Sequence, residues 1–213
     1  ASFLAPVLSS VGIIMIVTTG FWASVEKDLK RLLAYSVLLE TGFSLVMISF
    51  KSDEGLTLLY QSSVPRILAL ALLVYSLSIF ASSGVDLTLI GMRGVIRRYP
   101  FATAGILLAL FTISGFPLFS SFPLRIELLR QLGLTSVSSV VWTVVGLTGF
   151  IIAVIKFFID VTLPLDDKWH VNEKISQIIV ICLIILILVL FGLFPLFLQN
   201  IISPFTMELP VLR

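Results

Sequence analysis

The chain has 213 residues, of which 58% are hydrophobic and 12% charged, and its mean hydropathy is +1.14. Soluble domains carry about a quarter charged residues, so this composition excludes a soluble globular protein. The net charge of +2 is too small to indicate a nucleic-acid partner, and the single Cys182 excludes a disulfide framework or a thiolate metal site.

Apolar segments long enough to span a bilayer follow one another along the whole chain. A helix needs about 20 residues to cross a hydrocarbon core of about 30 Å, so about six such helices fit this length. We therefore predict an all-α integral membrane protein with a single transmembrane domain over residues 1–213. The expected helices cover residues 6–24, 31–50, 56–80, 101–132, 136–163 and 175–199.

Basic residues are concentrated in the first, third and fifth connections, which predicts the orientation in the membrane. They are Lys27, Lys30, Arg31, Arg93, Arg97, Arg98, Lys168 and Lys174. The opposite side has Lys51 and Arg213, with Arg125 and Arg130 if these count as loop residues. We expect the basic side to face the cytoplasm, or the matrix or stroma. The third connection, residues 85–98, mixes apolar residues with arginines and is expected to lie along the membrane surface.

Glu40 lies in the middle of the second segment. It follows Arg31 by nine residues, about 14 Å along a helix, which places it near the membrane midplane. An ionised carboxylate there is costly without a partner, so we expect Glu40 to be neutral, paired or facing water. Such a group can titrate at physiological pH. The alternative is a protonated side chain that bonds a neighbouring helix and has no further role.

Arg66 follows Pro65 about ten residues into the third segment. A proline inside a helix bends it and leaves a carbonyl group unpaired, which a guanidinium can satisfy. A structural role for Arg66 is therefore favoured, although a pair with Glu40 is also open.

The fourth segment is predicted to be discontinuous. Residues 101–132 would form a helix of about 48 Å, longer than the hydrocarbon core. The segment contains Gly115, Pro117 and Pro123, which favour two half-helices with a break near residues 114–123 inside the membrane. Broken helices of this kind recur at ion-binding sites of transporters. The alternative is a straight span that ends near Ser120, followed by a surface helix.

Three charged residues follow this predicted break. Glu127 and Arg130 are three apart and can pair on one helix face. If the helix is broken, Arg125 lies in the membrane beside exposed backbone, where an ion path is plausible. If it is not, all three residues are interfacial.

The remaining polar residues favour no catalytic or cofactor site. Lys156 and Asp160 are four apart near the end of the fifth segment, and we expect a self-compensating pair at the membrane surface. His170, the single histidine, lies in a polar connection without metal-ligand spacing. The sequence has no phosphate loop and no nucleophile–base motif. We therefore expect no metal, no cofactor and no redox or hydrolytic centre, and a role that concerns ions, protons or partner helices.

Three motifs carry a family resemblance. Residues 28–36, DLKRLLAYS, are very similar to a signature of the antiporter-like subunits of respiratory complex I, Mrp-type cation/proton antiporters and membrane-bound hydrogenases. Residues 113–122, ISGFPLFSSF, resemble the segment that breaks a helix in this family. Residues 192–195, GLFP, resemble a motif near the end of its last helix. The order and spacing of the three motifs agree with the family.

The resemblance covers nearly all of this chain but only the C-terminal half of a family member. It implies one inverted-repeat unit of the complex I antiporter-like fold, with one broken helix, followed by the last helix. The chain begins at Ala1 without a methionine. We therefore expect a processed, split or partial polypeptide.

The sequence departs from the family at residues that would relay protons. Arg125 stands where the family usually has a lysine, and Ser62 and Arg66 replace a histidine and a lysine. Glu40 stands where a histidine is common. A guanidinium effectively cannot lose its proton, so these arginines are poor proton carriers.

The resemblance implies a membrane-arm subunit that takes part in proton translocation coupled to quinone reduction elsewhere in a complex I-type enzyme. The candidate residues of the proton path are Glu40, Arg66, Arg125, Glu127 and Lys156. The implied partners are other membrane-arm subunits, including an N-terminal half, and lipids. The implied location is a bacterial inner, mitochondrial inner or thylakoid membrane. The alternatives are a scaffold subunit that no longer conducts and a small independent cation/proton antiporter.

Overall fold

The computed structural model describes residues 4–50, 53–163 and 171–194. In these ranges the chain is helical and contains no strand, which confirms the predicted all-α class. The elements are α1 (Leu4–Val25), α2 (Leu29–Ser49), α3 (Asp53–Ser82), the 3-10 helix η1 (Val95–Arg97), α4 (Pro100–Ile113), α5 (Ser121–Thr135), α6 (Val137–Thr162) and α7 (Ile175–Leu193).

Five of these helices, α1, α2, α3, α6 and α7, are long and apolar enough to cross a bilayer. The fourth predicted segment contains two shorter helices. The apolar α4 has 14 residues, and α5, with 15 residues, carries the charged side chains. A sixth span made from α4 and α5 together therefore stays a prediction. In α3, Pro65 lies inside a single helix of 30 residues, which continues on both sides of the proline.

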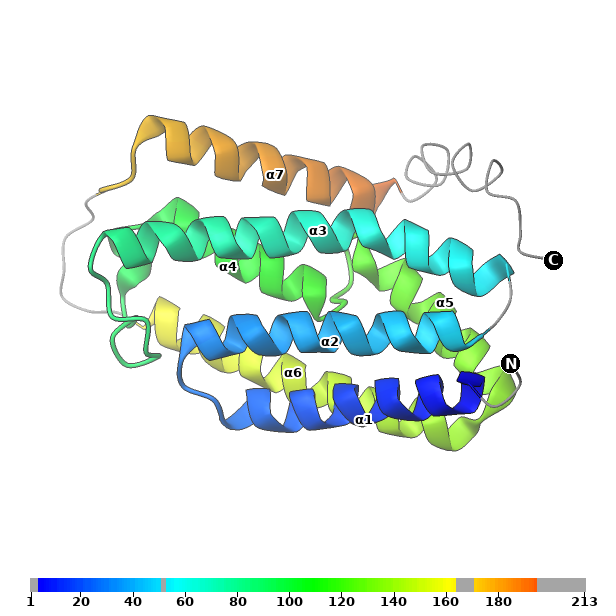
Figure 1. Ribbon diagram of the computed structural model, residues 1–213. Coiled ribbons are helices and arrows are strands. Elements are labelled where there is room, and N and C mark those ends of the chain that lie inside the picture. The colour runs from blue at the N-terminus through cyan, green and yellow to red at the C-terminus, as the bar shows by residue number, and fades with distance from the viewer. Residues whose placement is uncertain (1–3, 51–52, 164–170, 195–213) are drawn as a thin grey trace.

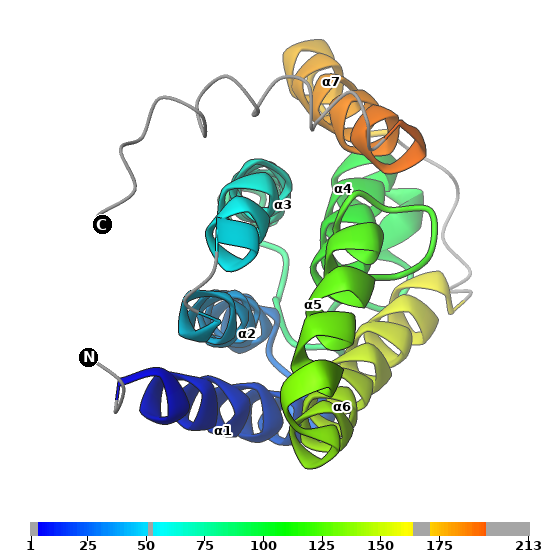
Figure 2. The same ribbon diagram turned by 90° about the vertical axis from the view of Figure 1, so that its right-hand side faces the viewer.

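The helices run roughly along one common direction (Figure 1). Seen from the end of the bundle, α1, α2 and α3 follow one another along one side, and α4, α5 and α6 lie on the other (Figure 2). The N-terminal helix α1 packs against both α2 and α6, α3 packs against α4, and α7 lies against α3 and α4. Side chains from α2 and from α4 and α5 therefore meet in the interior.

The helix α4 ends where glycine and proline predict a break. Gly115 has a positive φ of 69° and Leu118 one of 79°, so the backbone leaves the helical path twice. Pro117 cannot donate a backbone hydrogen bond to continue the helix, whereas Pro123 lies in the first turn of α5, where proline is tolerated. Residues 114–120 thus join two helices that share no common ladder of hydrogen bonds.

Gly192 of α7 supports this connection from outside. A Cβ atom at Gly192 would lie 2.3 Å from the carbonyl oxygen of Leu118 and 3.0 Å from the backbone nitrogen of Ser120. Only a glycine allows the helix to approach the connection so closely. The last described helix, α7, therefore packs directly against the connection between α4 and α5.

The connections α1–α2 and α3–α4 meet at one end of the bundle (Figure 1). The side chain of Asp28 caps α2 and accepts a hydrogen bond from the backbone N–H of Lys30 at 2.8 Å. Backbone bonds then join the two connections: Leu29 N–H donates to Leu87 at 3.0 Å and Leu89 N–H to Lys27 at 2.8 Å. The start of the DLKRLLAYS motif is thereby fastened to residues 85–98.

Candidate functional site

A charged pair lies in the interior of the bundle. Glu40 of α2 and Arg125 of α5 are each 5% exposed. The Arg125 Nη2 group donates to Oε1 of Glu40 and also to the carbonyl oxygen of Ile113 at 3.2 Å. Ile113 is the last residue of α4, so the pair forms where that helix ends.

The guanidinium of Arg125 is also stacked on an aromatic ring. Its central carbon lies 3.5 Å from the centroid of Phe43, a residue of α2 that is 1% exposed. On the other side, a Cβ atom at Gly115 would lie 2.8 Å from Cγ of Arg125. The arginine therefore occupies a narrow space between α2 and the start of the break.

Arg66 lies close to this pair but does not bind Glu40. Its Nη1 group donates to the hydroxyl of Ser44, and Ser44 in turn donates to the backbone carbonyl of Glu40 at 2.9 Å. The possible Arg66–Glu40 pair is therefore not formed, and the Glu40 carboxylate binds Arg125 instead. Arg66 is near enough for its charge to act on Arg125. Glu40 thus binds one arginine through its carboxylate, and its backbone carbonyl is linked to a second arginine through Ser44.

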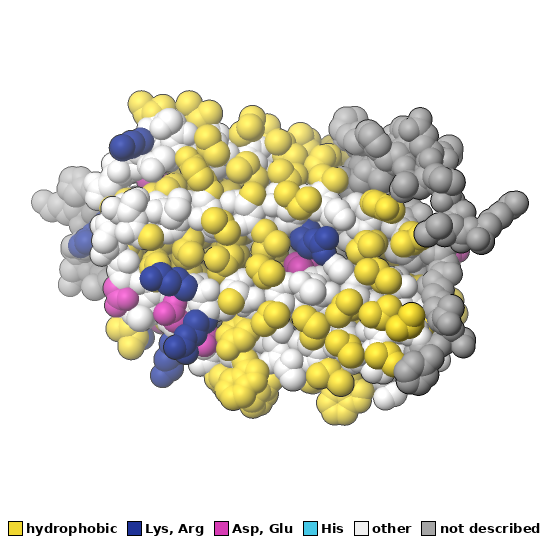
Figure 3. Space-filling model, in the orientation of Figure 1, with side chains coloured by type: hydrophobic (Ala, Val, Ile, Leu, Met, Phe, Trp, Pro, Cys, Tyr) yellow, Lys and Arg dark blue, Asp and Glu magenta, His cyan; other side chains and the backbone are white. Residues whose placement is uncertain are grey.

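The surface of the bundle separates apolar from charged side chains along its length. Figure 3 shows a broad hydrophobic band over the helices and charged groups at the end that holds the α1–α2 and α3–α4 connections. A small group of basic and acidic side chains also lies in the middle of the band, far from that end. Charges in the middle of an apolar surface are costly unless they are paired. The candidate site itself is the buried Glu40–Arg125 pair, which its contacts identify.

Glu127 and Arg130 belong to a separate cluster on α5. The Arg130 Nε and Nη2 groups donate to the two carboxylate oxygens of Glu127 at 2.8 and 2.6 Å, which confirms the predicted pair. The side-chain amide of Gln131 donates to Glu127 and to Glu54 of α3, both at 3.2 Å. This cluster ties α5 to the start of α3.

The expected Lys156–Asp160 pair is wrong. Lys156 Nζ donates to the backbone carbonyl of Ser24 at 2.6 Å, and Asp160 accepts from Arg93 Nε at 3.4 Å. The last turn of a helix has carbonyl groups without helical partners, so the end of α1 offers Lys156 an acceptor that its own helix does not. His170 lies outside the described residues.

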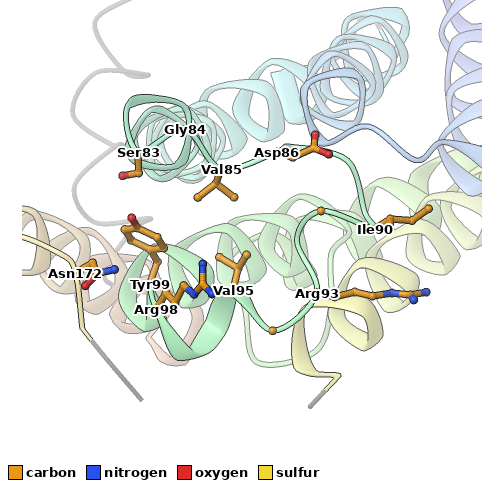
Figure 4. A pocket seen from close by; sticks show the side chains of 12 residues that line it. Ser83, Gly84, Val85, Asp86, Ile90, Arg93, Val95, Arg98, Tyr99 and Asn172 are labelled. Atoms are coloured by element: carbon orange, nitrogen blue, oxygen red, sulfur yellow. The ribbon is translucent and has the colours of Figure 1, made fainter. Parts of the chain in front are cut away.

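A pocket of about 410 Å³ lies at the loop end of the bundle (Figure 4). Arg98 and Tyr99 border one wall, Ser83 lies across from them, and the Arg93 side chain points away toward α6 (Figure 4). The sequence analysis did not identify this pocket. Its lining comes from the α3–α4 connection and from Asn172 in the connection before α7, which no periodic pattern brings together.

Glu173 was also missed by the sequence analysis. Its carboxylate accepts from the backbone N–H groups of Ala102 at 2.6 Å and Phe101 at 3.2 Å, and it thereby caps α4. Burial raises the pKa of the Glu173 carboxyl above its ordinary value, and the two backbone hydrogen bonds oppose this shift. One indication of such a cap was available in the sequence. Tyr99, the residue before α4, does not cap the helix with its side chain, so an acceptor has to come from another part of the chain.

The part of the chain that the structure describes holds no group of three histidine, cysteine or acidic residues that could bind a metal ion. Buried donors without a protein partner do occur near the break, at Arg125 Nε and Ser120 Oγ. Buried polar groups of this kind usually bind ordered water. The chemistry of the site is therefore that of one carboxylate, two guanidinium groups and hydroxyls.

Comparison with known proteins matches this chain to one family of membrane proteins. The family model for the membrane part of the NADH:quinone oxidoreductase/Mrp antiporter proteins matches residues 1–156. The chain is 30% identical over 122 residues to NADH-quinone oxidoreductase subunit N 2 of Syntrophobacter fumaroxidans, a match that covers 54% of this chain and 25% of that protein. The chain therefore spans only part of the length of the curated relatives that it matches.

Two solved structures have a similar fold. A chain of the Mrp complex from Dietzia sp. superposes with a TM-score of 0.84 and 13% identity, over 93% of this chain and 46% of that one. A chain of respiratory complex I from Thermus thermophilus with bound NADH superposes with a TM-score of 0.81 and 19% identity, over 95% of this chain and 43% of that one.

Proposed function

We propose, from the premise that this chain belongs to the NADH:quinone oxidoreductase/Mrp antiporter membrane family, that it is part of an antiporter-like subunit that takes part in proton translocation. The motif-based resemblance and the family match agree on this membership. The redox reaction, the reduction of a quinone, would take place elsewhere in the assembly, because the sequence offers no redox centre of its own.

The Glu40–Arg125 pair carries the proposal. In this proposal Glu40 is the partner that gains and loses a proton, since a guanidinium keeps its own. When Glu40 takes up a proton, its attraction to Arg125 is lost and the pair can open. When it releases the proton, the pair forms again. Arg66 and Arg125 would keep positive charge near Glu40 without carrying a proton themselves.

The position of the pair supports this role. We propose that α4 and α5 together cross the membrane as one broken span, with residues 114–120 in its interior. The two helices are each about 21–23 Å long, so neither crosses a bilayer of about 30 Å alone. Broken helices in transporters expose backbone groups to a polar interior, and here Arg125 binds such a group at Ile113.

Energy for translocation would reach this site through charge. In our proposal, a change of charge in a neighbouring membrane subunit shifts the balance between the paired and open states, as coupling between two sites requires. The partners would be other subunits of a membrane arm, including one with the N-terminal half of the family fold, and lipids. Lys156 binds the carbonyl of Ser24, and Glu127 binds Arg130, so neither side chain contacts the Glu40–Arg125 pair. In our proposal, these two residues flank the path at its two ends.

A scaffold without conduction is the second candidate function. The observation in its favour is the close enclosure of Arg125 by Phe43, Ile113 and Gly115, which also suits a permanent bridge between α2 and α5. In that case Glu40 would stay ionised and paired with Arg125. The two functions predict opposite results for the same variant.

The deciding experiment is proton translocation by the assembled membrane complex in vesicles, with Glu40→Gln compared with the natural chain. We expect the number of protons moved per turnover to fall, because the amide that replaces the carboxylate accepts hydrogen bonds but cannot ionise. Asp160→Asn is the matched control, since it makes the same change in the ion pair with Arg93 at the loop end. Unchanged translocation with Glu40→Gln would rule out the proposed role and favour the scaffold. Cation exchange by the purified chain alone in liposomes would instead indicate an independent antiporter.

A further inference from the structure

We propose that Phe43 is a positioning residue that holds the Arg125 guanidinium in place, so that Glu40 is the partner that moves when their ion pair opens. This inference rests on the proposed function and adds the question of which group moves. It concerns a residue that neither touches a proton nor titrates. The argument starts from the spacing of two residues on α2.

Glu40 and Phe43 lie three residues apart on α2 and therefore share one face of the helix. Both contact the same guanidinium: Glu40 accepts a hydrogen bond from Nη2, and the Phe43 ring lies 3.5 Å from the central carbon. A guanidinium is planar, so it can stack on a ring while its N–H groups bind acceptors in its own plane. One turn of α2 thus supplies an acceptor and a flat surface to Arg125.

The two partners of the ion pair differ in how firmly they are held. Arg125 is bounded by the ring of Phe43, by the carbonyl of Ile113 at 3.2 Å and by the backbone at Gly115. These contacts come from α2, from the end of α4 and from the break. The side chain of Glu40 has one polar contact among the described residues, which is Arg125 itself. Loss of the pair would release Glu40 and leave Arg125 where it is.

A released Glu40 side chain would have a second cation nearby, Arg66 of α3, which binds α2 one turn beyond Glu40. Ser44 follows Glu40 by four residues on α2, and its hydroxyl accepts a hydrogen bond from Arg66 of α3. In the described part of the chain, Arg125 from α5 binds the Glu40 carboxylate, and Arg66 from α3 binds Ser44, whose hydroxyl donates to the backbone carbonyl of Glu40. The carboxylate would move between two cations, of which the first is fixed by Phe43.

The test compares variants of Phe43 in the assembled membrane complex. Phe43→Leu removes the ring and keeps an apolar side chain, whereas Phe43→Tyr keeps the ring. Phe150→Leu, in α6, is the control for loss of an equally buried phenylalanine. We measure proton translocation per turnover and the density of the Arg125 side chain in a map of each variant.

We expect Phe43→Leu to lower translocation by about tenfold and to weaken or split the Arg125 density, because the cation–ring attraction in a desolvated site is lost. Phe43→Tyr should rescue both readouts, and Phe150→Leu should leave both unchanged. Natural translocation and ordered Arg125 density with Phe43→Leu would overturn the inference, as would equal impairment by leucine and tyrosine. If Phe43→Leu does not assemble, Phe43→Met against Phe43→Tyr makes the same comparison.

The results separate this inference from the proposed function. If Glu40→Gln abolishes translocation while Phe43→Leu changes neither readout, only the role of Phe43 is wrong. If Glu40→Gln leaves translocation unchanged, the proposed function fails, and the Arg125 density in Phe43→Leu still decides whether the ring positions the guanidinium.

Discussion

Two ion pairs of the same chemical kind lie in very different surroundings in this chain. Arg125 and Glu40 meet in the interior, where both side chains are 6% exposed. Arg93 and Asp160 meet at the loop end at 3.4 Å, with side chains that are 50% and 21% exposed. Water screens the outer pair, so its formation changes little, whereas either partner of the inner pair would be stranded without the other. We therefore expect the inner pair to contribute much more to stability than the outer pair.

The largest expected effect comes from stranding Glu40. Arg125→Gln should lower the free energy of unfolding by about 3–5 kcal/mol, because the carboxylate is left buried without a cation. The double variant Glu40→Gln/Arg125→Gln should recover part of this loss. Thermal unfolding of the mildly solubilised protein measures both. If Arg125→Gln lowers the free energy of unfolding no more than Arg93→Gln does, burial does not distinguish the two ion pairs.

The next effect tests the backbone that encloses the inner pair. Gly115→Ala should cost about 1–3 kcal/mol, because the residue has a φ of 69° and its new Cβ would meet Cγ of Arg125 at 2.8 Å. Gly133→Ala, in the helical part of α5, is the control. A Cβ there meets its nearest neighbour at 3.7 Å, so we expect no loss. Equal melting temperatures for the two variants would mean that the break tolerates a side chain.

The outer pair should give a much smaller change. Arg93→Gln is expected to cost at most about 1 kcal/mol at low salt and less at high salt, because exposed ion pairs are weak and screened. Unfolding measured at two salt concentrations checks this. A loss that is as large as that of Arg125→Gln and independent of salt would show that the loop end is less hydrated than its exposure indicates.

The smallest expected effect is a pH dependence from Glu173. Burial raises the pKa of this carboxyl in the folded chain, so the folded state binds the proton more tightly than the unfolded state. Its contribution to stability is therefore complete at pH values below the ordinary carboxyl pKa and is lost as the pH rises through the raised value. Glu173→Gln should lack this component. Unfolding of both chains from about pH 4 to about pH 8 measures the difference, and identical pH curves would contradict it.

The sequence predicted those features that depend on neighbours along the chain. Apolar length predicted the positions of α1, α2, α3, α6 and the start of α7, and the glycine and prolines near residue 115 predicted where α4 ends. The last predicted helix continues to residue 199, and residues 195–199 lie outside the described part of the chain. Helical spacing predicted the Glu127–Arg130 pair, which the structure confirms. The same spacing failed for Lys156 and Asp160, because acceptors and donors from α1 and from the third connection compete for these side chains.

Partners that lie far apart in sequence could not be predicted. Arg125 reaches Glu40 across 85 residues, and this depends on the direction in which α5 leaves the break. Glu173 caps α4 from 71 residues beyond Ala102, which no local capping rule detects. Phe43 has the appearance of an ordinary core residue in the sequence, and only its position against Arg125 distinguishes it.

The contact at Gly192 has a consequence for how the molecule is made. The backbone around Leu118 packs against α7, which is synthesised after α4 and α5. Until α7 has entered the membrane, the helix that packs against the backbone of Leu118 and Ser120 is missing, and we expect the connection between α4 and α5 to become ordered only after that insertion.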